Sequence, residues 1–217
     1  RYYINNIIMS TSNQHIISIY NSRKYLLEIL SERGFDISNY ENCSINEIGI
    51  LTDQNQLDIL LENKDVSKKI YEKYYVNKVI KAPNIYAMIE DLFHLENILS
   101  KKDDLIIIVK DEPNDTLIQT VKDIWMEEGI YISLLNIKRL QFNILKHKLV
   151  PKHTILTKDE EKELKLKFNI LNNRQIPDIS YFSPVSLVMG IRPDDIVKIE
   201  RKSRTAIDAN YYRVCKM

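Results

Sequence analysis

The spacing of apolar side chains predicts helices at both ends of the first half of the chain. Apolar residues recur near helical spacing in 17–33, and Gly34 follows as a helix stop. Residues 84–99 also carry their apolar side chains on one face. Between them, short apolar segments at 45–51 and 57–61 are separated by polar residues and are typical of a β-hairpin.

Residues 66–75 carry a mostly polar pattern, which indicates a short polar-faced helix or an insertion. Tyrosines alternate with lysines in this region, and such a mixture can bind nucleic acid. Because Asp65 and Glu72 dilute the positive charge, an amphipathic helix with a solvated basic face is the favoured interpretation.

An uninterrupted β-branched run, Leu105–Val109, predicts a strand that is buried on both faces of a sheet. A helix over 114–128 and a strand over 130–135 are expected to follow it. A strand, a helix and a strand within about 30 residues indicate a βαβ unit with parallel strands. The first part of the chain, residues 1–145, is therefore expected to be one α/β domain.

The pattern changes after Phe142, and a smaller α+β domain is expected over 146–217. Thr157 and Glu160 have the spacing of a capping box, for a helix that runs to about Phe168. A second short helix begins at Ser183-Pro184 and ends at Gly190. Residues 196–200 and 211–214 are expected to pair as strands. The fold class of the whole chain is therefore α/β in the first domain and α+β overall.

Composition and charge narrow the classes of function. The chain is 44% hydrophobic and 28% charged, with a formal net charge of +1. A free-standing nucleic-acid binder needs a stronger basic excess, because phosphate neutralisation dominates its affinity. Cys43 and Cys215 are expected to be free thiols in a reducing compartment. No apolar run approaches the ~20 residues that a membrane span needs.

The motifs of common enzyme classes are missing from the sequence. Four scattered glycines cannot form a phosphate-binding loop or a dinucleotide fingerprint. His147 and His153 are not at the i, i+4 spacing of a helical zinc pair. We therefore expect no catalytic residue, no metal and no cofactor.

One enzymatic alternative is a divergent Mg²⁺-dependent nuclease of the restriction type. Such a site needs an acidic residue on one strand and Glu-x-Lys on the next, so that two carboxylates hold the ion. Asp58 and Lys110 fit two of these positions, but Ile108 stands where the glutamate is required. The sequence therefore argues against this chemistry, and Lys110 is read as a solvated strand end or a phosphate contact.

Residues 147–217 resemble a known family. The order and spacing of their motifs are similar to the assembly domain shared by the fifth-largest common subunit of eukaryotic nuclear RNA polymerases and its shorter archaeal homologue. The matching segments are 147–153 (HKLVPKH), 156–160, 175–179, 183–185, 190–201, 203–206 and 212–214. The first part resembles the eukaryotic jaw domain more weakly, through residues 23–35 and the strand at Leu105.

The resemblance implies a non-catalytic subunit of a DNA-directed RNA polymerase. It implies a jaw domain with a restriction-nuclease-like sheet, and an assembly domain that docks on the largest subunit. The chain would be one copy in a hetero-oligomer with other polymerase subunits, near downstream duplex DNA and away from membranes. The implied DNA contacts are Lys110, Pro113 and Asn114. The implied interface residues are His147, Pro151, His153, Arg192, Arg201, Thr205, Tyr212 and Arg213.

The sequence departs from the family at one loop, where Arg204 replaces a glutamate and Ile207 replaces a glycine. Such drift, together with a bias toward Ile, Asn and Lys, favours a divergent source, either an AT-rich protist or a large DNA virus. The resemblance implies a nuclear location for a cellular protein, and a virion or cytoplasmic viral factory for a viral one. A free transcription adaptor that keeps the assembly domain is a further alternative.

Overall fold

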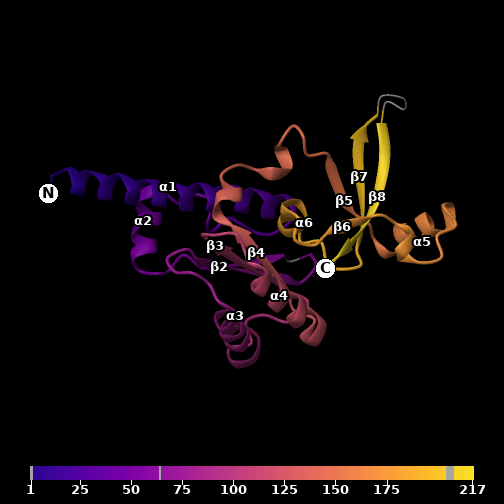
Figure 1. Ribbon diagram of the computed structural model, residues 1–217, viewed down its shortest axis with the longest axis horizontal. Helices are drawn as coiled ribbons and strands as arrows, with labels where there is room; N and C mark the ends of the chain where they lie inside the picture. Colours follow the sequence, from indigo (N-terminus) through magenta and orange to yellow (C-terminus); the bar gives the residue numbers. More distant parts are fainter. Residues whose placement is uncertain (1, 64, 204–207) are drawn as a thin grey trace. The chain divides into compact units, whose positions relative to one another are not determined.

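The computed structural model describes residues 2–63, 65–203 and 208–217, and it describes the side chains of all of these except 2–12 and 208. The chain forms two compact units, Arg1–Asn143 and Ile144–Met217, each with its own four-stranded sheet (Figure 1). The units therefore divide between residues 143 and 144, whereas the boundary predicted from the sequence lies between residues 145 and 146. The mixture of helices and sheets confirms the expected fold class.

The sheet of the first unit has the strand order β1-β2-β3-β4. Its first pair is antiparallel and its other two pairs are parallel. The strands are β1 (Ile59–Asn63), β2 (Lys68–Tyr75), β3 (Asp104–Val109) and β4 (Tyr131–Asn136). Every residue of β3 is buried, as the β-branched run predicts, and its parallel pairing with β4 confirms the βαβ unit.

Helices lie on both faces of this sheet, with α1 on one side and α3 and α4 on the other (Figure 1). They are α1 (Tyr2–Glu32), α3 (Ala82–Ile89), the π-helix η1 (Glu90–Leu95) and α4 (Asp115–Glu128), and the 3₁₀-helix η2 (Ile137–Leu140) follows β4. Helix α1 buries Ile19, Leu26 and Leu30 completely. It ends where predicted, because Gly34 takes a left-handed φ of 87° and a Cβ there would lie 3.0 Å from the Asn63 side chain.

The hairpin expected over 45–61 is wrong. Residues Ile45–Asp53 form the helix α2, and only β1 is a strand. The cause is a capping box, in which the Ser44 hydroxyl accepts from the Glu47 amide at 3.3 Å and the Glu47 carboxylate accepts from the Ser44 amide at 2.6 Å. These bonds satisfy backbone donors that a helix start leaves free, and they favour the helix over a strand.

The short helix or insertion expected over 66–75 is also wrong, since Lys68–Tyr75 is strand β2 within the sheet. Its alternation is hidden in the sequence because the buried positions include a carboxylate. Ile70 and Glu72 are both fully buried and point to the same face. A glutamate inside a sheet does not read as a core residue, so the strand periodicity is lost.

The sheet of the second unit has the strand order β5-β7-β8-β6. Its strands are β5 (Lys152–Ile155), β6 (Asp178–Ser180), β7 (Ile196–Lys202) and β8 (Asp208–Lys216). The 3₁₀-helices of this unit are η3 (Ile144–Lys146) and η4 (Asn173–Gln175). Strands β7 and β8 pair in antiparallel fashion, as expected. The short strands β5 and β6 are not predicted from the sequence.

Both helices expected in the second unit are confirmed. Helix α5 (Lys158–Lys167) begins at the predicted capping box. The Thr157 hydroxyl accepts from the Glu160 amide, and the Glu160 carboxylate accepts from the Thr157 amide. Helix α6 (Pro184–Met189) begins at Ser183 and ends at Gly190, which has a left-handed φ of 69°. One core cluster packs α5 against the sheet, and its buried members are Leu164, Ile176, Ile196 and Val214.

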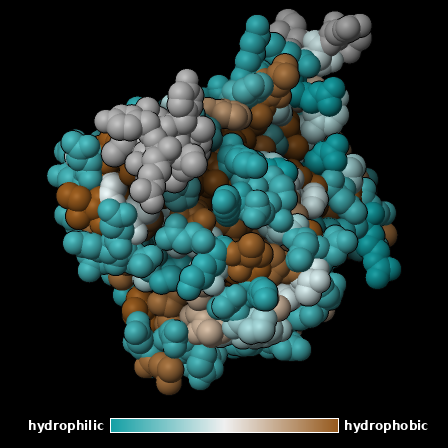
Figure 2. All heavy atoms as spheres, turned by 60° about the vertical axis from the view of Figure 1, so that its left-hand side comes forward, coloured by the Kyte–Doolittle hydropathy of each residue, from teal (hydrophilic) through white to brown (hydrophobic). Residues whose placement is uncertain are grey.

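Hydrophilic side chains predominate on the face that Figure 2 draws, and its apolar patches are separated by polar ones. Scattered apolar patches of this kind are usual on protein surfaces. Among the described residues, no helix combines the length and the apolar character that crossing a membrane would require.

Candidate functional site

The position that a nuclease would use for its metal is filled by an internal ion pair. The Asp58 carboxylate accepts from the Lys73 ammonium at 2.5 Å, from the Tyr71 hydroxyl at 3.2 Å and from the Tyr74 amide at 3.2 Å. Burial first, and the Asp58 charge second, raise the pKa of Tyr71 to about 12. The hydroxyl therefore stays protonated and acts as a donor to Asp58.

No second carboxylate joins Asp58 among the described residues. Ile108 lies on β3 opposite Tyr74 of β2 and is fully buried, so the required glutamate position holds an alkyl group. The described part of the chain also holds no group of three or more His, Cys, Asp or Glu side chains that could bind a metal ion. One carboxylate that is already paired with lysine has too little free negative charge to hold Mg²⁺. The donor set does not fit the nuclease alternative.

Two of the three tyrosines of β2, Tyr71 and Tyr74, have structural roles in this arrangement. The Tyr74 hydroxyl is buried, and the Tyr71 hydroxyl is bonded to Asp58. A nucleic-acid surface would need these rings to be open for stacking on bases. The aromatic and lysine mixture at 66–75 is therefore explained by a strand, and not by the amphipathic helix expected from the sequence.

Lys110, Pro113 and Asn114 lie together on the short loop between β3 and α4. Lys110 and Asn114 are exposed, and Pro113 is partly buried. The Asn114 side chain caps α4 by accepting from the Leu117 amide at 2.9 Å. This cap already uses one of the backbone donors at the helix start, so the loop offers a phosphate fewer free amides than the sequence implies.

The acidic residues around this loop are partly neutralised. Glu112 accepts from Arg139, which follows β4, at 2.9 Å, and both side chains are about half exposed. Because β3 and β4 are parallel, their carboxyl ends lie at the same edge of the sheet. This edge combines three cations with three carboxylates, so it carries balanced rather than strongly positive charge: Lys110, Lys138 and Arg139 against Asp111, Glu112 and Asp115.

Three of the predicted interface residues share one face of the sheet in the second unit. Residues that pair across antiparallel strands point to the same side. The register aligns His153 with Ile199, Ile199 with Tyr211, and Val197 with Arg213, so His153, Arg201 and Arg213 extend from one face. Together with Tyr211, these residues form what we call the basic face.

Aromatic and backbone contacts hold the arginines of the basic face in position. The Arg201 guanidinium carbon lies 4.7 Å from the centroid of the Tyr211 ring, a cation–π geometry. Arg213 donates to the Asp178 carbonyl at 2.7 Å, which ties β8 to β6. Arg201 and Arg213 are both exposed, which leaves guanidinium donors within reach of carboxylates on a partner.

Tyr212 points to the opposite face. Its ring lies 6.0 Å from the ring of Phe168, and its side chain packs on the core cluster under α5. The Tyr212 side chain therefore contributes to the core of the second unit, whether or not it also contacts a partner. Tyr212 and Arg213 are neighbours on one strand, so their side chains point to opposite faces. The sequence does not show which of these two faces is covered by the core, so it could not separate their roles.

His147, Pro151 and His153 form a compact connection into β5. The His147 carbonyl accepts from the Val150 amide at 2.8 Å, which closes a turn. His153 donates from Nδ1 to the Pro151 carbonyl at 2.7 Å, and partial burial lowers the pKa of its imidazole. At neutral pH the ring is therefore uncharged, with Nε2 as an acceptor.

The last two predicted interface residues differ in how far they can be described. Arg192 lies in the turn after α6, where its amide donates to the Asp195 carboxylate at 2.9 Å. Thr205 lies outside the described residues, together with the substituted positions Arg204 and Ile207.

Two buried carboxylates in the first unit escape prediction from sequence. Asp104 accepts from Arg33 at 3.2 Å and from Lys68 at 2.8 Å, which joins α1, β2 and β3. Glu72 is fully buried, and neither of its oxygens has a hydrogen-bond partner among the described residues. A pair of acidic residues before the apolar run at Leu105 is the only available signal for Asp104, and Glu72 gives none.

Comparison with known proteins gives matches over both units. The family described as "RNA polymerase Rpb5, C-terminal domain" matches residues 142–215. The "DNA-directed RNA polymerases I, II, and III subunit rpabc1" of Dictyostelium discoideum is 28% identical over 193 residues, which cover 89% of this chain and 94% of that protein.

Two other relatives show how the similarity is distributed. The "DNA-directed RNA polymerases IV and V subunit 5B" of Arabidopsis thaliana is 26% identical over 211 residues, 94% of this chain and 93% of that protein. The "DNA-directed RNA polymerase subunit Rpo5" of Pyrococcus abyssi is 46% identical over 74 residues, 34% of this chain and 89% of that protein. The similarity therefore spans nearly the whole chain in one kind of relative and about a third of it in the other.

Proposed function

The chain belongs to the Rpb5 family of DNA-directed RNA polymerase subunits, and we propose that it serves as a non-catalytic subunit of such a polymerase. The observation that carries this proposal is the similarity to the Dictyostelium subunit, which extends over 94% of that protein's length. The lone Asp58 carboxylate, already paired with Lys73, supports the non-catalytic part of the proposal. As a subunit of a eukaryotic nuclear RNA polymerase, the protein would be located in the nucleus.

The second unit docks on the largest polymerase subunit through its basic face. Arg201 and Arg213 present guanidinium groups there, and a guanidinium fork suits carboxylate pairs on a partner surface. The Tyr211 ring is 43% exposed, which adds apolar area beside the charge. Interfaces are enriched in Tyr and Arg at their strongest contacts, so this combination fits a docking surface.

Charge reversal on the basic face tests the docking. Arg201→Glu should weaken association of the full chain with the polymerase by at least ~10-fold, since a central charged anchor carries about 2 kcal/mol or more. Arg174→Glu is the matched control, because Arg174 is an exposed arginine of the same unit that lies in η4 and is not part of the basic face. Equal binding by the two variants would rule out the basic face as the docking surface.

The first unit lies in the lower jaw and touches downstream duplex DNA through the β3–α4 loop. Lys110 is the exposed cation of this loop, and Asn114 sits at the start of α4 where an anion is favoured. The balanced charge of the sheet edge limits this contact to the assembled polymerase. Unchanged crosslinking to downstream DNA after replacing both Lys110 and Asn114 by alanine would show that the loop is not a DNA contact.

A further inference from the structure

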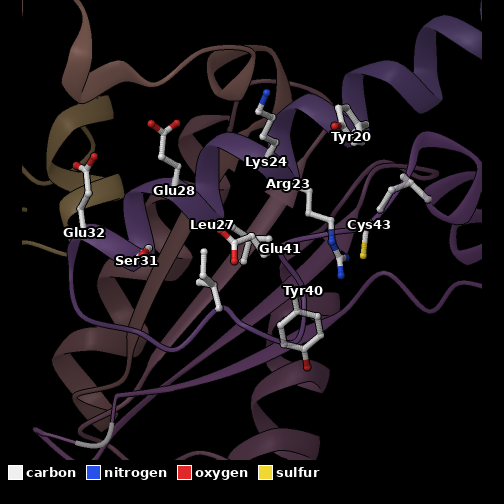
Figure 3. Close-up of a pocket in the computed structure, with 12 residues that line it drawn as sticks. Tyr20, Arg23, Lys24, Leu27, Glu28, Ser31, Glu32, Tyr40, Glu41 and Cys43 are labelled. Atoms are coloured by element: carbon white, nitrogen blue, oxygen red, sulfur yellow. The ribbon is translucent and has the colours of Figure 1, made fainter.

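A pocket of about 360 Å³ opens between α1, the loop that follows it and α2 (Figure 3). Leu27 and Ile48 contribute apolar wall, and Arg23, Tyr40 and Cys43 also line it. In Figure 3 the Arg23 side chain leaves α1 toward the Tyr40 ring and the Cys43 thiol. Pockets of this size are large enough to enclose a small ligand.

Arg23 brings an unused donor to this pocket. Its side chain is only 5% exposed, and its guanidinium carbon lies 5.6 Å from the centroid of the Tyr40 ring. One terminal nitrogen donates to the Leu57 carbonyl at 3.0 Å, whereas Nε has no hydrogen-bond partner among the described residues. The protein therefore satisfies only part of the guanidinium, and a carboxylate on a ligand would form a charge-assisted hydrogen bond with this group.

The charge of Arg23 is also poorly balanced by the protein. The carboxylate that acts on it electrostatically is Glu72, which is fully buried. Burial raises the pKa of Glu72 to about 8, and the opposing effect of Arg23 is smaller. Glu72 is therefore mostly protonated at neutral pH, and Arg23 remains a cation whose nearby carboxyl group is mostly uncharged.

The rim of the pocket does not repel an anion as strongly as its composition implies. Lys24 and Glu41 are both exposed at the rim and carry opposite charges. Glu28 and Glu32 line the pocket as well, but in Figure 3 their side chains leave α1 in the direction away from Arg23 and Tyr40. The interior thus combines one cationic donor with leucine, isoleucine and tyrosine surfaces, which suits an acid with an apolar body.

We propose that this pocket binds a carboxylate carried on an apolar or aromatic group, with the Arg23 guanidinium as its donor. The apolar body packs against Leu27, Ile48 and the Tyr40 ring. The site lies in the first unit and does not depend on the proposed role in transcription. The same chemistry is present in a free aromatic acid and in the terminal residue of a peptide.

Cys43 provides a reporter for this site. Its thiol lines the pocket and is partly exposed, whereas Cys215 is fully buried and burial raises the pKa of its thiol to about 12. Alkylation of the native full chain at Cys43 can therefore be followed by mass spectrometry. Iodoacetate and iodoacetamide react by the same substitution, in which the thiolate displaces iodide, and differ in carrying a carboxylate or an amide.

The rates of these two reagents test the proposal directly. At Cys43, the ratio of the iodoacetate rate to the iodoacetamide rate should exceed the same ratio for free glutathione by about tenfold, the value of one charged hydrogen bond. The Arg23→Gln variant should lose this excess, and the Lys24→Gln variant should keep it. A ratio equal to that of glutathione in the unaltered chain would overturn the proposal.

Protection of Cys43 gives a second measurement that needs no variant. N-acetylphenylalanine should slow iodoacetamide labelling of Cys43 in a saturable manner, and N-acetylphenylalanine amide should protect at least about tenfold less well. Equal protection by acid and amide, or none by either, would contradict the assignment. A tetrapeptide that ends in phenylalanine identifies the source, since tighter protection than by the free acid indicates a peptide terminus.

Discussion

Arg33, the residue that follows α1, donates to the buried carboxylate of Asp104 at 3.2 Å and so fixes the end of the long helix to the first residue of β3. Lys68 reaches the same carboxylate at 2.8 Å from the start of β2. Asp104 is only 1% exposed, so it depends on these two cations for compensation of its charge. The contact orders the edge of the sheet opposite to the proposed DNA loop.

Removal of this carboxylate should destabilise the first unit. Asp104→Asn removes the negative charge that Arg33 and Lys68 share, and breaking a buried ion pair in this way costs about 3 kcal/mol. Urea unfolding, followed by the signal of the only tryptophan, Trp125 in α4, measures the loss. Lys69→Gln is the control within the same unit, because the side chains of its ion pair with Glu62 are 41% and 54% exposed. A loss no larger than that of the control would mean that Asp104 does not hold the fold.

Glu72 should make the stability of the first unit fall with rising pH. Its pKa is raised from 4.5 to about 8 in the folded chain, so the folded state keeps a proton that the unfolded state releases. Stability from this group is present below about pH 4.5 and is lost as pH rises toward 8, by up to about 1.4 kcal/mol per pH unit. Arg23 is the charged group that opposes this rise in the pKa of Glu72, and Glu72 in turn raises the pKa of Tyr74.

Glu72→Gln separates this effect from the titration of other groups. The amide is nearly the same size and cannot ionise, so the variant should lose less stability than the unaltered chain between about pH 5 and pH 8. Denaturant unfolding at both pH values measures the difference. Parallel pH dependence in the two proteins would show that Glu72 does not titrate in this range.

Lys110 and Asn114 should respond differently to replacement by alanine. Asn114→Ala removes the cap of α4 and should cost about 1 kcal/mol of stability, whereas Lys110→Ala should leave stability unchanged. In the assembled polymerase, Lys110→Ala should weaken the dependence of downstream-DNA crosslinking on salt, because one phosphate contact is lost. If the salt dependence of crosslinking were unchanged in Lys110→Ala, Lys110 would not contact a phosphate and would be a solvated residue at the end of β3.

The elements that the sequence predicts are those fixed by local chemistry. The run Leu105–Val109 is apolar at every position, so it reads as a strand buried on both sides and is one. The capping pairs at Thr157 and Ser183 likewise define helix starts that the structure contains. These signals act within a few residues and need no knowledge of tertiary contacts.

The elements that the sequence misses depend mostly on distant partners. Strand β2 is unrecognisable in isolation because Glu72 occupies one of its buried positions. The capping box at Ser44 and Glu47 is a local signal, but the two apolar segments at 45–51 and 57–61 favour a hairpin and outweigh it. The pairing of Arg201 with Tyr211 follows from the register of β7 against β8, which sequence spacing alone does not determine.

Co-purification is the most direct test of the proposal that this chain is a docked, non-catalytic polymerase subunit. The tagged full chain is recovered from extract of its own source, and the bound proteins are quantified by mass spectrometry. The largest polymerase subunit should be present in a one-to-one ratio with the chain, and Arg201→Glu should reduce it while Arg174→Glu does not. Recovery of the chain without any large polymerase subunit would contradict the account.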